Sequence, residues 1–146
     1  MTTIEIIRRD GQGSVRPELR DMLAIVREKG EGLHWKIAAL EARGDLSSLG
    51  YSMLELEEEV SRYPLGMPMA WELLWKLSEL IEDALEISLA GSKTPDSDFD
   101  VRSDAFEALV VVLQLQDGSI WRVTSSSEAL IQRYTSSFHG THIETG

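Results

Sequence analysis

The chain has 146 residues, a hydrophobic fraction of 42%, a formal net charge of −11 and no cysteine. This length fits one domain, residues 1–146, with one core. The lack of cysteine excludes disulfides, a thiol nucleophile and zinc sites with cysteine ligands. The N-terminus has no signal-peptide pattern, and charges in the most apolar window, 68–90, exclude a membrane span. We therefore expect a cytoplasmic protein.

The negative charge is concentrated in the middle of the chain. Residues 1–30 carry six Lys/Arg and five Asp/Glu, residues 31–107 carry six and seventeen, and residues 108–146 carry two and three. An acidic surface repels nucleic acid and anionic membranes and speeds encounter with basic partners. We therefore expect a protein partner, with no nucleic acid and no membrane. The alternative is that the acidic residues serve only to keep the protein soluble.

The N-terminal third shows three patterns. Residues 2–8 are β-branched enough for an opening strand. Residues 17–29 place their apolar side chains on one helical face, with a proline at the start and a glycine just after the end. Residues 33–42 fit a strand or a helix, and the alternation of Trp35 and Ile37 with polar or small residues favours the strand.

The middle third predicts two helices. Ser52 followed by Glu55 is a capping-box pattern, which indicates a helix from Met53 to about Arg62. After a proline–glycine hinge, the stretch from Pro68 to Ala90 has polar residues at steps of three and four on an otherwise apolar background. It predicts one long helix, which we place at the centre of the fold.

The C-terminal third begins with the clearest β signal. Leu109–Gln116 and Ser119–Thr124 flank Asp117-Gly118, which predicts a hairpin whose two-residue turn sets Leu115 opposite Ile120. A last helix to about Phe138, with Leu130, Ile131 and Tyr134 inward, and an edge strand over Thr141–Thr145 follow. The predicted fold is α+β: one domain, with an antiparallel sheet whose C-terminal hairpin packs against the long helix and two or three further helices.

Candidate metal ligands occur in two places, and we expect no metal or cofactor at either. Five acidic residues match the spacing of a calcium-binding EF-hand loop, but Val101 stands where that loop needs glycine. These are Asp96, Asp98, Asp100, Asp104 and Glu107. His139 and His142, near the C-terminus, have too few companions for a closed site.

No pattern of a catalytic site stands out in the sequence. There is no Gly-x-Ser-x-Gly elbow and no glycine-rich phosphate loop. The run Glu55, Glu57, Glu58 and Glu59 could supply an acid and a base, but the apolar residues between them indicate one buried and one solvated helix face. We therefore expect a binding surface there and no enzyme.

Two segments, Tyr51–Gly91 and Leu109–Phe138, resemble small bacterial immunity proteins encoded beside polymorphic toxins, including those of contact-dependent growth inhibition. The similar features are a hinge into a Trp-Glu-Leu-Leu helix, the Asp-Gly-Ser turn before Trp121, and a serine-rich cap on the last helix. Ile120 departs from the pattern, which has an aromatic residue at that position. The resemblance carries over no catalytic residue.

The resemblance implies a non-catalytic protein that binds and neutralises a cognate toxin domain, and the acidity suits a basic, nuclease-type toxin. The first candidate surface is the acidic loop Asp96, Asp98, Asp100 and Asp104, with Phe99 as an apolar anchor. The second is the helix face of Glu55, Glu58 and Glu59. Two alternatives stay open: a small homodimeric regulatory or adaptor protein, and an enzyme of unrecognised class. As an immunity protein, the chain would be a monomer or a weak homodimer.

Overall fold

A computed structural model describes residues 2–7, 17–30, 32–94, 109–138 and 141–145. Its elements, in chain order, are β1 (Thr2–Ile7), α1 (Leu19–Gly30), β2 (His34–Gly44), the 3-10 turn η1 (Ser47–Leu49), α2 (Met53–Ser61), β3 (Met67–Met69), α3 (Trp71–Leu80), β4 (Ile81–Ser92), β5 (Leu109–Gln116), β6 (Ile120–Ser125), α4 (Glu128–Ser137) and β7 (Thr141–Thr145).

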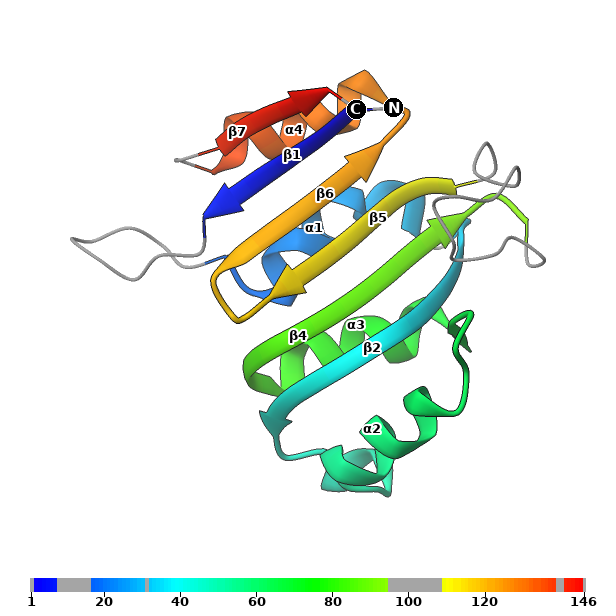
Figure 1. Ribbon diagram of the computed structural model, residues 1–146. Coiled ribbons are helices and arrows are strands. Elements are labelled where there is room, and N and C mark those ends of the chain that lie inside the picture. Colours follow the sequence, from blue (N-terminus) through cyan, green and yellow to red (C-terminus); the bar gives the residue numbers. More distant parts are fainter. Residues whose placement is uncertain (1, 8–16, 31, 95–108, 139–140, 146) are drawn as a thin grey trace.

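The seven strands form one antiparallel sheet in the order β3-β2-β4-β5-β6-β1-β7. Helices α1, α3 and α4 lie behind one face of this sheet, and α2 lies beside β2 (Figure 1). The main hydrophobic core joins the helices to the facing side of the sheet. The predicted α+β fold, one domain with an antiparallel sheet, is confirmed.

Several local predictions are also confirmed. Of the stretch 33–42, residues 34–42 belong to strand β2, and a helix begins at Met53. Its capping box is complete, because the Ser52 hydroxyl accepts from the Glu55 N–H and the Glu55 carboxylate accepts from the Ser52 N–H, each at 3.2 Å. The last helix, α4, is capped by Ser127.

The prediction of one long helix over Pro68–Ala90 is wrong. Helix α3 ends at Leu80 and strand β4 begins at the next residue, Ile81, which is already extended with φ −72° and ψ 122°. The residues of β4 include several helix formers, so the local propensity of this segment does favour a helix. As a strand, it pairs with β2 on one side and β5 on the other. These two ladders outweigh local propensity.

The hairpin is confirmed, but its predicted register is wrong by one residue. The connection has three residues, Asp117 to Ser119, and Leu115 faces Trp121 in place of Ile120. Asp117 and Gly118 both have positive φ, 52° and 66°. Because a one-residue slip turns each side chain to the other face, the observed register is the one that puts Trp121 in the core.

Buried polar side chains connect the helices to one another and to the sheet. The indole N–H of Trp121 donates to the Pro17 carbonyl at 3.0 Å, and the Tyr134 hydroxyl of α4 donates to the Met22 carbonyl of α1 at 2.7 Å. Burial raises the pKa of Tyr134, because desolvation disfavours the phenolate.

Within the described residues, no helix has the length and apolarity needed to cross a membrane.

The junction between α3 and β4 predicts an intolerant position at Gly44. This glycine pairs with Ile81, and an added Cβ would overlap the carbonyl oxygen of Leu80, a backbone atom that cannot rotate away. We expect Gly44→Ala to lower the free energy of unfolding by about 2–3 kcal/mol, measured by urea denaturation.

Gly50→Ala is the matched control for this substitution. Gly50 has φ +87°, and an added Cβ there would meet no atom within 4 Å, so its substitution should cost only about 1 kcal/mol of backbone strain. Equal costs at Gly44 and Gly50 would contradict the tight junction.

Candidate partner-binding surface

Leu85 is the extra residue of a β-bulge in β4. Glu86 pairs with Glu41 of β2 and Ala84 pairs with Ala42, so Leu85 has no counterpart on that strand. Ala84 is buried, whereas Leu85 and Glu86 are consecutively exposed, and Leu85 keeps 51% of its surface in contact with solvent. A bulge redirects side chains in this way, and here it turns a leucine outward.

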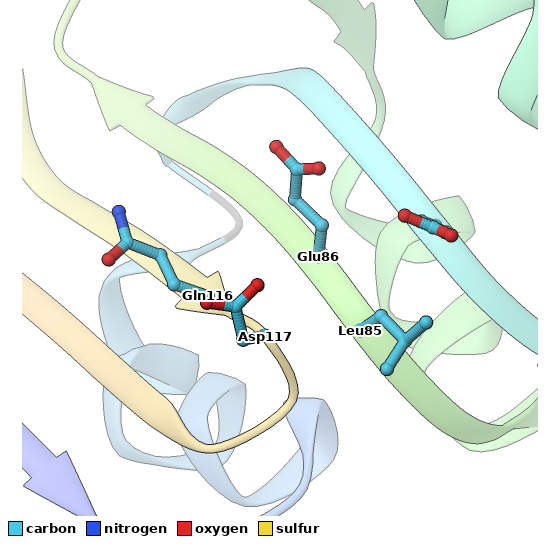
Figure 2. Close-up of a pocket in the computed structure, with 5 residues that line it drawn as sticks. Leu85, Glu86, Gln116 and Asp117 are labelled. Carbon is cyan, nitrogen blue, oxygen red and sulfur yellow. The ribbon is translucent and has the colours of Figure 1, made fainter.

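The turn of the β5–β6 hairpin fixes the backbone at this bulge. The Gly118 N–H donates to the Leu85 carbonyl at 2.9 Å. The turn residue Asp117 and the strand residue Gln116 thereby lie next to Leu85 and Glu86 (Figure 2). The exposed leucine therefore sits on a backbone held from both neighbouring strands.

Two adjoining hollows of about 430 Å³ each flank Leu85, and together we call them the Leu85 groove. They share Glu41 and Leu85. The first is lined by Glu41, Leu85, Glu86, Gln116 and Asp117, and the second by Glu41, Ala42, Arg43, Glu57, Asp83, Ala84 and Leu85. The lining thus carries five carboxylates and one cation around an exposed leucine.

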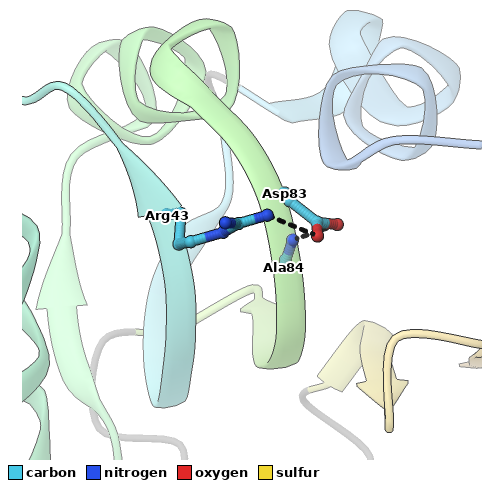
Figure 3. Close-up of polar contacts among 3 residues, drawn as sticks. All are labelled: Arg43, Asp83 and Ala84. Carbon is cyan, nitrogen blue, oxygen red and sulfur yellow. Dashed lines mark hydrogen bonds and ion pairs between the residues drawn. The ribbon is translucent and has the colours of Figure 1, made fainter.

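Two of these carboxylates are engaged in the fold. Asp83 forms an ion pair with Arg43 at 3.3 Å and also accepts from the Ala84 N–H at 3.0 Å (Figure 3). Glu57 of α2 accepts from the Ala42 N–H at 2.9 Å, at the outer edge of β2. The side of the groove nearest α2 is therefore partly neutralised and held by hydrogen bonds.

The other three carboxylates face solvent. The side-chain carboxylates of Glu41, Glu86 and Asp117 have no hydrogen bond or ion pair with any other residue in the described part of the chain. Glu41 and Glu86 are direct cross-strand partners, an arrangement of like charges that lowers stability. The first hollow is therefore free to receive a cationic group from another molecule.

The structure places the sequence-predicted helix residues away from this groove or in structural roles. Glu55 completes the α2 capping box, Glu59 pairs with Arg62 at 3.0 Å, and Glu58 is exposed. Of that glutamate run, Glu57 is the residue that reaches the groove. The predicted loop residues, Asp96, Asp98, Phe99, Asp100 and Asp104, lie outside the described residues, as do Glu107 and His139.

Comparison with protein-family models, with curated proteins and with solved structures found no match. Among the described residues, no group of three or more His, Asp or Glu side chains is placed to hold a metal ion. The arrangement that the structure does offer is an open, acidic hollow with an aliphatic side chain at its centre.

Sequence reasoning missed Glu41, Leu85, Glu86 and Asp117. The helix predicted over Pro68–Ala90 places Glu86 among its polar residues, and the hairpin pattern gives Asp117 only a role in the turn. The Asp-Gly turn was a usable signal for Asp117, but the proximity of Glu41 to Glu86 depends on the β2–β4 register.

The opposition of Glu41 and Glu86 predicts that removing one charge stabilises the fold. We expect Glu41→Gln to raise the free energy of unfolding by about 0.2–0.5 kcal/mol at low salt, and salt should reduce this gain. Glu128→Gln is the control with the opposite sign, because Glu128 lies in the first turn of α4, where a negative charge is favourable. A Glu41→Gln variant that is less stable than wild type would contradict the repulsion.

Proposed function

We propose that this chain is a non-catalytic immunity protein that binds and neutralises a cognate toxin domain, and that the Leu85 groove is part of the contact surface. The observation that carries the proposal is the exposed leucine that a bulge presents among solvent-facing carboxylates. A protein interface of this kind combines an apolar anchor with complementary charge. The resemblance of Tyr51–Gly91 and Leu109–Phe138 to immunity proteins points to the same function.

The charge distribution supports a basic partner. Residues 31–107 supply β2, α2, α3 and β4, and they hold seventeen of the 25 acidic residues. A nuclease-type toxin needs a basic surface to bind phosphates, so an acidic protein can occupy that surface in place of the nucleic acid. Such long-range attraction speeds association, which matters for an inhibitor that must act before the toxin does.

The two parts of the groove would contribute differently to the complex. Glu41, Glu86 and Asp117 would attract and orient basic side chains of the toxin, chiefly through the association rate. Leu85 would be buried in the complex and would slow dissociation. In this proposal the protein acts in the cytosol, and it blocks the toxin without breaking any bond.

The proposal is tested with the toxin candidate encoded by the reading frame beside this one. We expect the C-terminal domain of that product to arrest growth when expressed in a surrogate bacterium, and co-expression of this chain to restore growth. A toxic domain that neither binds this chain nor is relieved by it would contradict the immunity function.

Binding kinetics of the same pair test the groove. Glu86→Lys with Asp117→Lys should slow association about tenfold or more at low salt and flatten the salt dependence, whereas Leu85→Ala should mainly speed dissociation. Glu128→Lys is the control for charge reversal away from the groove. If Asp96→Lys with Asp98→Lys and Asp100→Lys slows association while the groove variants do not, the contact surface is at the acidic residues Asp96 to Asp104.

A further inference from the structure

The two edges of the sheet differ in how they resist pairing with another strand. At one edge, β3 has only three residues, and its central Pro68 has no N–H to donate. The part of the outer edge of β2 that β3 does not pair with lies against α2. There the Glu57 carboxylate of α2 accepts a hydrogen bond from the Ala42 N–H. Short edge strands, proline and covering side chains are the usual protections against edge-to-edge association.

The opposite edge, β7, is longer than β3 and has no proline. It has five residues, Thr141–Thr145, contains no proline, and pairs with β1 as the last strand of the sheet. In an antiparallel ladder, alternate N–H and C=O groups point away from the paired neighbour. The outer side of β7 therefore offers a row of backbone donors and acceptors for a further strand.

The sequence of β7 is complementary to itself in the antiparallel direction. Pairing two copies about Ile143 sets Thr141 opposite Thr145, His142 opposite Glu144, and Ile143 opposite itself. Thr–Thr pairs and pairs of a carboxylate with an N–H donor are favourable cross-strand neighbours. We propose that β7 pairs with β7 of a second copy and joins two seven-stranded sheets into one continuous sheet.

The register inside the chain extends into this pairing. Arg122 of β6, Glu5 of β1 and His142 of β7 are successive cross-strand partners. Glu144 of the second copy would be the next residue in that row, so basic and acidic residues would alternate across the new contact.

The distribution of charge also favours this edge. Strands β1, β5, β6 and β7 come from residues 1–30 and 108–146, which are nearly balanced in charge, whereas β2 and β4 come from the acidic segment (Figure 1). Pairing through β7 keeps the two acidic halves at opposite ends of the dimer, where their repulsion is weakest. Both copies of the Leu85 groove, which lies at β2 and β4, stay open in this arrangement.

Sedimentation equilibrium of the full chain tests the dimer. We expect a reversible dimer, twice the 16.4 kDa of the chain, to predominate at about 100 µM. Glu144→Lys should weaken self-association about tenfold, although it lowers the net negative charge and so the general repulsion. Glu128→Lys makes the same change of charge outside β7 and should not weaken it. A wild-type chain that stays monomeric at about 500 µM would overturn the proposal.

Single cysteines test the register, because the chain has no cysteine of its own. The two copies of Ile143→Cys would lie directly opposite each other, within the Cα separation that a disulfide needs, and mild oxidation should give a covalent dimer. The two copies of Thr145→Cys would be about 14 Å apart along the strands and should not cross-link. Cross-linking of Thr145→Cys to the same extent as Ile143→Cys, or of neither variant, would overturn the pairing.

Discussion

The pairing of β4 on both sides is the interaction on which the rest of the structure depends. A segment of helix-forming residues becomes a twelve-residue strand because β2 and β5 satisfy its backbone. Since α3 ends at Leu80 with no connecting loop, the start of β4 is fixed against Gly44 of β2. The pairing of β2 with β4 contains shifts in register, and one of these shifts is the bulge that exposes Leu85.

The proposed binding surface follows from the same pairing. Register brings Glu41 and Glu86 together, and the bond from Gly118 to the Leu85 carbonyl adds the hairpin turn and its Asp117. These carboxylates repel one another, so they reduce stability where they stand. A molecule can tolerate this cost when the core is large, and a basic partner would relieve it on binding. The acidic residues that β2, α2, α3 and β4 carry thus give local negative charge to one half of the sheet.

Much of the fold could be predicted because its signals are local. A Ser-x-x-Glu capping box, an Asp-Gly turn between β-branched runs and the alternation around Trp35 each act over a few residues, and each predicted its element correctly. The stretch from Ile81 to Ser92 could not be predicted in this way. Asp83 and Glu86 continue the three- and four-residue spacing of polar residues in α3, yet the conformation of the stretch is decided by strands distant in sequence.

The candidate site was less predictable than the fold for the same reason. Glu41 and Glu86 lie 45 positions apart in the chain and become neighbours only through the register. An exposed leucine has no sequence signature when it depends on a bulge. The dense glutamate run of α2 was visible in the sequence, but Glu55, Glu57 and Glu59 have structural contacts of their own. Charge density along the chain is therefore a poor guide to where charge gathers on the surface.

The most direct test of the proposed function is to map the contact on the isotope-labelled chain by backbone NMR, during titration with the toxin domain encoded beside it. We predict that the largest shift changes occur at the amides of Leu85, Glu86 and Gly118 and at their neighbours in β2. Changes confined to α1, α3 and α4, on the other side of the sheet, would contradict a partner-binding role for the Leu85 groove.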